Sequence, residues 1–285
     1  MRDVAILSAV RTPIGRAARG ALRFTRPDDL GALAVREALR RAEVSATTIE
    51  DLVMGCAQPE AEQGLNVARQ VGFLAGLPDT TPAMIVNRFC SSGLQATAIV
   101  ADRIATGAID AGVSGGVESM SMIPMGGSRV SLNPRMVAEF PDAYLPMGNT
   151  AENVARRFSI SRTEQDAFAF ASHEKAVRAW EQGTFAAEVV PVPTRVFEGE
   201  TWRDVTVDRD DGPRADTSLE KLASLRPTFD PTGTVTAGNS SPTNDGAAAG
   251  APRIHRVVPG AETAGQTRRQ LQPRHHRAGR RRARA

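Results

Sequence analysis

The sequence predicts an α/β fold, and three observations support this. As far as Glu118, short apolar runs of strand length alternate with segments in which apolar residues recur at helical spacing. The run 111–117 is rich in glycine, which allows neighbouring backbones to approach closely. After Glu118 this alternation stops. The alternating part is typical of a layered and mostly parallel sheet.

The first strand is expected at 4–10, where an uninterrupted apolar run suggests burial on both faces. A helix from about 28 to 42 follows, because apolar residues recur at helical spacing and Arg40 and Arg41 occupy the last turn. The same reasoning predicts further strands at 52–56, 83–86 and 111–117 and further helices at 65–75 and 91–105.

Cys90 lies where the strand 83–86 gives way to the helix that starts at Ser91. A thiol at the start of a helix faces unpaired backbone N–H groups and the positive end of the helix dipole, and both favour the thiolate. Cys90 is therefore a candidate nucleophile. The competing interpretation is an inert buried cysteine, since cysteine is among the residues most often found in protein cores.

The helix that follows Cys90 has no clear polar face before Asp102. A helix that is apolar on most sides is normally buried. We therefore expect this helix to lie in the protein interior.

The stretch 119–243 is expected to form an inserted α+β lobe. The segments 149–152 and 161–164 each resemble a capping box, and the second should open a helix that extends to about Gln182. The runs 189–196 and 201–207 predict a hairpin. His173 is the only histidine before Ala251. A satisfied contact on the helix surface is expected for it rather than the role of a catalytic base.

Composition excludes several classes of protein. The chain has 285 residues, enough to bury a full core, and no apolar run approaches the roughly 20 residues that cross a bilayer. The N-terminus shows no signal-peptide pattern, so a cytoplasmic protein that does not enter membranes is expected. The two cysteines, Cys56 and Cys90, exclude a disulfide framework and a cysteine-rich metal site. Neither a dinucleotide-binding glycine motif nor a phosphate-binding loop occurs.

The segment 251–285 differs in composition from the rest of the chain. Ten arginines and one acid, Glu262, give it a net charge of +9, which leaves −6 for the preceding residues out of the total of +3. Few of its residues are apolar, so we expect it to be disordered. A shifted reading frame would explain the abrupt change. The alternative is a tail that binds nucleic acid, and it is disfavoured because no aromatic or folded reader accompanies the charge.

Several motifs make the chain resemble the thiolase family. They occur in family order and at family spacing, from about Val4 to Ala249. The motifs are Arg11-Thr12-Pro13-Ile14-Gly15, Asn87 to Ala96 around Cys90, Gly116 to Ser121, Met147 to Ala155, Leu225-Arg226-Pro227 and the loop from Ala237 to Gly246.

The resemblance implies two α/β halves that pack together, with a loop lobe inserted in the first. In this chain, 1–118 completed by 244–250 would be the first half, 119–243 the loop domain and 251–285 the disordered tail. The resemblance also implies an acyltransferase that moves an acyl group between a 3-ketoacyl-CoA and CoA, with Cys90 as the nucleophile that carries the group as a thioester. The residues that match CoA-contact positions are Met147, Arg214, Leu222, Phe229, Ala237 and Ser241.

Arg214 suits the nucleotide end of CoA, because a guanidinium can pair with phosphate or stack on adenine. Pro146 stands where short-chain members of the family usually have a histidine, which favours the degradative enzymes of fatty-acid β-oxidation. The resemblance further implies that CoA is a co-substrate, that no cofactor is permanently bound, and that the protein forms a homodimer or homotetramer.

The motifs of the family's second half do not occur in this sequence. Absent are the Gly-His-Pro histidine that activates the nucleophile and the second cysteine that moves the α-proton. Cys56 matches a strand end in the first half instead. One acid–base group is typically worth about 10² to 10⁴ in rate, so we expect a truncated and catalytically impaired acyltransferase. The alternative is a non-catalytic fragment that binds CoA or a partner.

Overall fold

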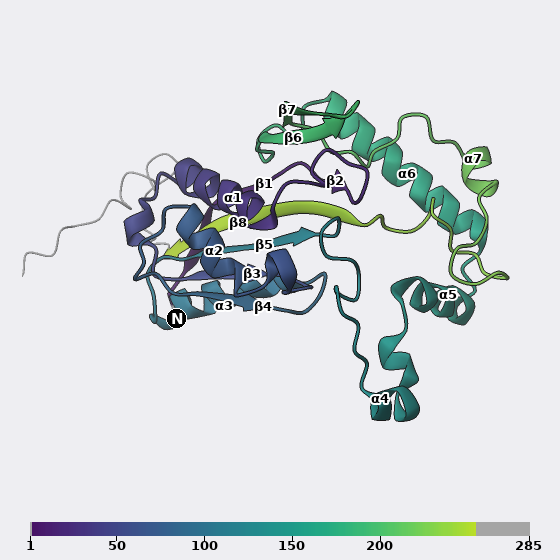
Figure 1. Ribbon diagram of the computed structural model, residues 1–285, viewed down its shortest axis with the longest axis horizontal. Helices are drawn as coiled ribbons and strands as arrows, with labels where there is room; N and C mark the ends of the chain where they lie inside the picture. Colours follow the sequence, from purple (N-terminus) through teal and green to yellow (C-terminus); the bar gives the residue numbers. More distant parts are fainter. Residues whose placement is uncertain (1, 255–285) are drawn as a thin grey trace, which may run out of the picture.

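The structure, a computed structural model, describes residues 2–254. Its main sheet has six strands, of which five follow the order β1-β8-β5-β3-β4 and the short β2 pairs with β8 (Figure 1). The strands are β1 (Val4–Arg11), β2 (Gly15–Arg16), β3 (Leu52–Gly55), β4 (Ala83–Val86), β5 (Val113–Ser119) and β8 (Asn244–Ile254). The predicted α/β class is confirmed.

Strand direction in the sheet is mixed. β3 pairs parallel with β4 and β5, whereas β8 pairs antiparallel with both β5 and β1. The four strands predicted from the sequence therefore point the same way, as does the short β2, and β8 runs against all five. The reason is that the chain leaves the sheet after Ser119 and returns beside it, with Asp245 opposite Ser119. A strand that re-enters at the end where its neighbour leaves must run antiparallel to that neighbour.

Helices cover both faces of the sheet. α1 (Pro27–Ala42) and α2 (Val67–Leu74) lie on one face and α3 (Ser92–Thr106) lies on the other (Figure 1). β3 shows how the sequence divides the core, because successive side chains of a strand point to opposite faces. Leu52 and Met54 join the core beneath α1 and α2, while Val53 packs with Val100 of α3.

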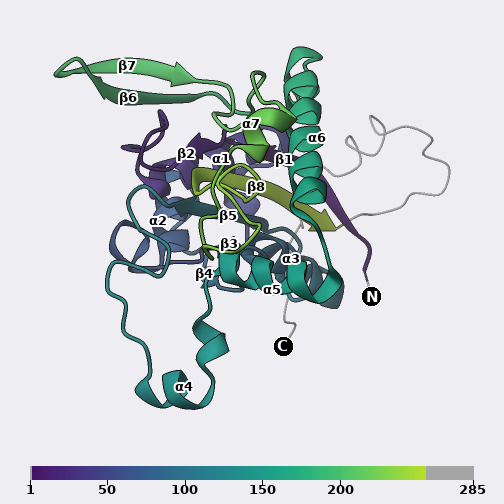
Figure 2. The same ribbon diagram turned by 90° about the vertical axis from the view of Figure 1, so that its right-hand side faces the viewer.

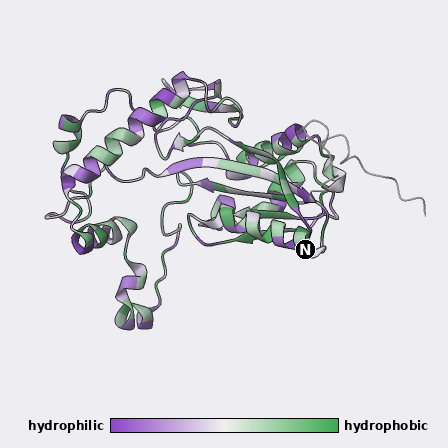
Figure 3. Ribbon diagram, turned by 180° about the vertical axis from the view of Figure 1, so that it is seen from behind, coloured by the Kyte–Doolittle hydropathy of each residue, from purple (hydrophilic) through white to green (hydrophobic). Residues whose placement is uncertain are grey.

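The residues between β5 and β8 contain four helices and a hairpin in the described structure. The hairpin packs on the core at Val192 and Val207, its tip extends beyond the α/β layers, and α4 lies at the end of an arm (Figure 2). Hydrophobic residues gather in the main sheet, whereas α6 carries polar and apolar residues along its length (Figure 3). The elements are α4 (Pro134–Glu139), α5 (Met147–Phe158), α6 (Arg162–Glu181), α7 (Leu219–Ala223), β6 (Val192–Glu198) and β7 (Thr201–Val207), and short 3-10 helices occur at Ala46–Thr48, Ala61–Gln63 and Pro141–Tyr144.

The two capping boxes predicted from sequence had different outcomes. Ser161 and Glu164 form the expected reciprocal box at the start of α6, and the hairpin is present. The prediction of a capping box at 149–152 is wrong. α5 begins at Met147, directly after Pro146, so Glu152 lies in the middle of the helix. Proline suits this boundary because it has no N–H to donate, and Pro146, with a ψ of 146°, still has an extended backbone just before the helix.

β1 and α3 are less buried than predicted. Ile6 is 60% exposed and Val10 is the only buried residue of β1, since β1 is an edge strand and α3 lies mainly over β3 and β5. α3 is buried along one stripe, at Ser92, Ala96, Val100 and Ile104. Its other side is open, with Leu94 75% exposed. Within residues 2–254 nothing covers that side, so the expectation of an interior helix is wrong there.

The last described strand corrects the predicted start of the tail. β8 continues to Ile254, beyond the boundary expected after residue 250. Ala251 is buried and Pro252 lies opposite Ile6 of β1. The predicted disordered segment therefore begins no earlier than residue 255, and its remainder, 255–285, lies outside the described residues.

Candidate active site

Cys90 lies in the turn between β4 and α3, as predicted. Side chains at both ends of this turn bind its backbone: the Asn87 Oδ1 accepts from the Phe89 N–H at 2.8 Å, and the Ser92 Oγ accepts from the Arg88 N–H at 2.8 Å. Phe89 adopts a left-handed backbone conformation, with φ of 48°. Such a conformation is costly for a bulky residue and persists only where surrounding bonds fix it. The backbone next to Cys90 is thus held in one conformation.

Glycines bring the start of α3 onto the sheet. A Cβ on Gly55, at the end of β3, would lie 2.6 Å from the Gly93 nitrogen. A Cβ on Gly116 of β5 would lie 3.7 Å from the Gly93 Cα. The predicted role of the glycine-rich strand is confirmed at Gly115, where a Cβ would overlap the Ala248 carbonyl oxygen of β8. The distance at Gly116 is an ordinary contact, so it is Gly55 of β3 that allows the first turn of α3 to approach the sheet.

The two thiols of the chain differ in accessibility. Cys90 is exposed, whereas Cys56 is buried, with the Gln63 Nε2 3.3 Å from its sulfur. Burial, reinforced by the negative charge of Glu118, raises the pKa of the Cys56 thiol to about 12. A thiol with that pKa is almost entirely protonated at neutral pH and is a poor nucleophile. The interpretation of an inert buried cysteine thus applies to Cys56 and not to Cys90.

Met147 and Phe229, two of the six residues matched to CoA contacts, lie close together. Met147 opens α5 and is 67% exposed, and Phe229 is also exposed. Gly148 connects them, because a Cβ at that position would overlap the Phe229 ring at 2.2 Å. The Asn149 amide also donates to the Phe229 carbonyl at 3.2 Å.

Leu222, Ala237 and Ser241 form a second group. Leu222 of α7 is buried, at 4% exposure, and it packs on the loop that carries the other two, since a Cβ on Gly238 would lie 2.6 Å from its Cδ2. Ala237 and Ser241 are exposed on this loop. Leu222 therefore supports the loop from beneath, and Ala237 and Ser241 are exposed on its surface.

Two buried carboxylates that the sequence did not reveal hold this loop. Glu152 of α5 is 2% exposed and accepts from the backbone N–H groups of Thr234 and Val235, at 2.9 and 2.7 Å. Asp166 of α6 accepts from the Asn239 amide at 2.9 Å. These bonds join α5 and α6 to residues about 70 to 80 positions later. In the sequence, Glu152 lies within the Met147 to Ala155 motif and was misread as part of a capping box.

Arg214 precedes α7 and is exposed. Its backbone N–H donates to the Nδ1 of His173 on α6 at 3.2 Å. The expectation that His173 makes a satisfied contact on the helix surface is confirmed.

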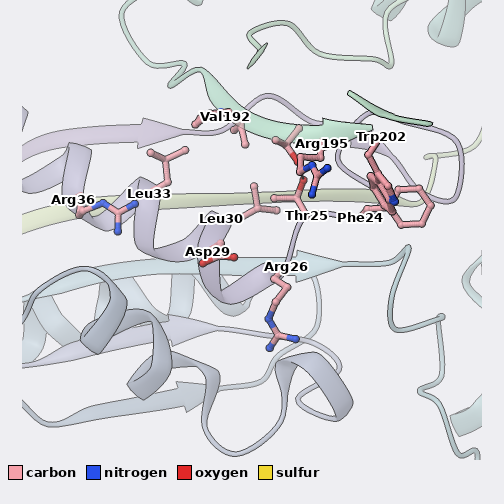
Figure 4. A pocket seen from close by; sticks show the side chains of 12 residues that line it. Phe24, Thr25, Arg26, Asp29, Leu30, Leu33, Arg36, Val192, Arg195 and Trp202 are labelled. Carbon is pink, nitrogen blue, oxygen red and sulfur yellow. Dashed lines mark hydrogen bonds between the residues drawn. The ribbon is translucent and has the colours of Figure 1, made fainter. Parts of the chain in front are cut away.

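The predicted site residues do not form one connected group. Among residues 2–254, no hydrogen bond or ion pair connects the Cys90 turn to the six matched residues. A groove of about 520 Å³ lies elsewhere, between the start of α1 and the β6–β7 hairpin, where the rings of Phe24 and Trp202 meet edge to face (Figure 4). The sheet separates α1 from α3, so this groove is not part of the candidate site.

The described part of the chain shows no group of three or more His, Cys, Asp or Glu side chains placed to hold a metal ion. Over the same residues, no helix has the length and apolar character required to span a bilayer.

Comparison with known proteins gives a consistent result. The model of the thiolase N-terminal domain matches residues 4–250. The 3-ketoacyl-CoA thiolase of Bacillus subtilis is 50% identical over 254 residues, which cover 87% of this chain and 65% of that protein. Peroxisomal 3-ketoacyl-CoA thiolases of Rattus norvegicus (B form) and Homo sapiens are each 44% identical, over 87% of this chain and 58% of their own length. The chain thus spans somewhat more than half the length of these relatives.

Proposed function

The chain belongs to the thiolase family, and we propose that it supplies the nucleophile of an acyltransferase that acts between a 3-ketoacyl-CoA and CoA. The observation that carries this proposal is the exposed Cys90, fixed by a tight turn at the start of α3. The names of the relatives, 3-ketoacyl-CoA thiolases of Bacillus subtilis and of peroxisomes, support the same reaction class.

In the proposed reaction the Cys90 thiolate attacks the 3-keto carbon of the substrate. The C2–C3 bond then breaks, its electron pair passes to C2, and C2 takes up a proton to leave as acetyl-CoA. The shortened acyl group remains on the Cys90 sulfur as a thioester. The thiolate of a second CoA attacks that thioester and releases the acyl-CoA, which regenerates Cys90.

We propose that the exposed surface around the 236–241 loop binds CoA. Met147, Arg214, Phe229, Ala237 and Ser241 would contact the ligand, with Leu222 holding the loop from beneath. The Arg214 guanidinium is suited to the phosphates of the nucleotide end. CoA is thus a co-substrate, and the chemistry requires no permanently bound cofactor.

Further parts of the proposal rest on the family and on the sequence. The sheet with its covering helices would be the first of two halves, and the lobe between β5 and β8 would be the loop domain. Pro146 before Met147 supports a degradative, β-oxidation type of substrate. We place the protein in the cytoplasm and expect a homodimer or homotetramer.

We further propose that the 285 residues turn over substrate slowly by themselves. The attack needs a base for the Cys90 proton and an acid for C2, and the histidine and cysteine motifs that supply them in the family do not occur in this sequence. Loss of one such group typically lowers the rate by about 10² to 10⁴.

A thiolysis assay with 3-ketoacyl-CoA substrates of several chain lengths tests these points. The expected result is a low rate that disappears in Cys90→Ala and persists in Cys56→Ala. A rate typical of full-length thiolases would contradict the impairment, and a rate unchanged in Cys90→Ala would contradict the nucleophile.

The second candidate is a CoA-binding protein without turnover. It is favoured by the hydrogen bonds of Glu152 and Asp166, which hold the loop with Ala237 and Ser241 in place. None of the described contacts connects this loop to Cys90. Titration calorimetry with CoA distinguishes the two. Binding that survives Cys90→Ala and weakens in Arg214→Ala, in a chain without measurable thiolysis, would establish the second candidate.

A further inference from the structure

Residues 210–216, which include Arg214, are hydrogen-bonded mainly at the two ends of the segment. At its upstream end the Asp210 Oδ1 accepts from the Ile14 N–H at 2.8 Å, and the Asp211 N–H donates to the Ile14 carbonyl at 2.9 Å. Downstream, the Lys221 Nζ lies 3.2 Å from the Asp216 carboxylate. Between these points, in the described structure, one hydrogen bond connects the Arg214 backbone to another element, and its acceptor is the His173 Nδ1.

This bond requires a neutral imidazole. A backbone N–H can only donate, so the Nδ1 that faces it must be unprotonated and the ring proton must lie on Nε2. When the ring is protonated both nitrogens are donors, and the acceptor for the Arg214 N–H is lost. The imidazolium would also face the Arg214 guanidinium, a like charge.

We propose that His173 is a positioning residue for CoA binding: its neutral imidazole holds the Arg214 backbone in place, and its protonation releases Arg214 and weakens CoA binding. This inference rests on the proposed function, because it takes Arg214 as the residue that meets the nucleotide end of CoA. It goes beyond the proposed function because it makes CoA binding depend on the protonation of a residue on α6.

The charges around His173 favour the neutral form at neutral pH. Burial lowers the pKa of the imidazole, and the Arg214 cation lowers it further, while Asp216 opposes them. On α6 the residues three and four positions away are uncharged: Ala169, Phe170, Ala176 and Val177. The bond to Arg214 is therefore present at neutral pH and is lost as the pH falls below the ordinary histidine value of about 6.5.

Asp216 does not titrate in the same range. Hydrogen bonding and attraction to Lys221 hold the pKa of this carboxyl below its usual value. It therefore stays ionised while His173 becomes protonated. The phosphate monoester of CoA also takes up a proton in this range, near about pH 6. The part of the change in CoA affinity between about pH 7.5 and 5.5 that disappears in a His173 variant is therefore the part assigned to His173.

The test uses three variants of the full chain and CoA as the probe. In wild type, calorimetry should show a Kd that is about three- to tenfold higher at pH 5.5 than at pH 7.5, the effect of one lost hydrogen bond. His173→Asn places an amide oxygen close to the Nδ1 position, so its Kd should change less with pH than that of wild type and only as far as the CoA phosphate titrates. His173→Ala should bind weakly at both values. In Arg214→Ala the part of the pH dependence that His173 contributes should be absent.

An NMR titration of the Arg214 amide separates failure of this inference from failure of the proposed function. The amide shift should follow His173 protonation in wild type and stay constant in His173→Asn, whether or not CoA binds. A shift that does not titrate, or a His173→Asn protein with the pH dependence of wild type, would overturn the inference. A titrating shift together with unaltered CoA affinity in Arg214→Ala would instead overturn the role assigned to Arg214 in the proposed function.

Discussion

Arg11 and Asp210 form a bidentate ion pair between the main sheet and the lobe of residues 119–243, with Nη1–Oδ1 and Nη2–Oδ2 distances of 2.8 and 3.2 Å. Arg11 ends β1, and its Nε also donates to Glu188 at 2.7 Å. The Asp210 carboxylate receives a further bond from the Trp180 indole at 3.2 Å. The Arg11-Thr12-Pro13 motif therefore anchors the lobe to the first strand.

We expect Arg11→Ala to destabilise the protein by about 2 kcal/mol, because it leaves the partly buried Asp210 carboxylate without its cation. Urea unfolding measures this change. Arg135→Ala is the matched control, since Arg135 pairs with Glu139 in an exposed i,i+4 contact and should cost no more than about 0.5 kcal/mol. Equal effects of the two substitutions would contradict the anchoring role.

Glu152→Gln should loosen the 236–241 loop. The Thr234 and Val235 N–H groups both donate to the Glu152 Oε1, and the Thr234 N–H and hydroxyl also donate to the Oε2, at 3.0 and 3.2 Å. Glutamine replaces the Oε2 with an NH₂ group, which cannot accept, so the two bonds of Thr234 to this position are lost. The expected loss of stability is about 1 to 3 kcal/mol. Glu139→Gln, on an exposed helix, is the control. Hydrogen exchange of the Thr234 and Val235 amides should accelerate in Glu152→Gln, and unchanged exchange would argue against this account.

Gly55→Ala should displace the start of α3, because its Cβ would meet the Gly93 nitrogen at 2.6 Å. The expected cost is about 1 to 3 kcal/mol, together with altered reactivity of Cys90. Gly93→Ala is the control within the same contact: its Cβ would lie 3.8 Å from the nearest atom outside its own helix, the Gly115 carbonyl oxygen, and alanine favours a helix. Stability that falls in both variants alike would contradict the close-approach argument.

Glu37 should contribute a small acid-dependent stability. Hydrogen bonds from Arg40 and Arg41 outweigh its desolvation and lower the pKa of its carboxyl to about 2. The contribution is therefore complete above about pH 4.5 and disappears as the pH falls towards 2. Glu37→Gln should remove about 0.5 kcal/mol at pH 7 and almost nothing at pH 2. Equal destabilisation by Glu37→Gln at both pH values would contradict this assignment.

The sequence predicts the part of the site that depends on residues adjacent in the chain. The apolar run 83–86 and the helical pattern after Ser91 place Cys90 at a strand-to-helix turn, and the structure confirms this. The exposure of Cys90 and Leu94 was not predictable, because it depends on which segments cover α3. Local patterns record the composition of a helix and do not record its neighbours in space.

Contacts between residues far apart in the chain could not be predicted from the sequence either. Glu152 meets Thr234 and Asp166 meets Asn239 only because α5 and α6 pack beside the loop, and neither pair lies at a spacing that local rules recognise. The direction of β8 has the same origin. It follows from where the chain re-enters the sheet after the lobe, opposite Ser119, and not from the residues of the strand itself.

The central claim is that the Cys90 sulfur accepts the acyl group. Incubation of the protein with a 3-ketoacyl-CoA or an acyl-CoA, followed by rapid acid quenching and peptide mass spectrometry, tests it most directly. The account predicts an acyl thioester on the peptide that contains Cys90, none on the peptide that contains Cys56, and no acylated peptide in Cys90→Ala. Acylation at Cys56, or at equal levels in Cys90→Ala, would contradict the account.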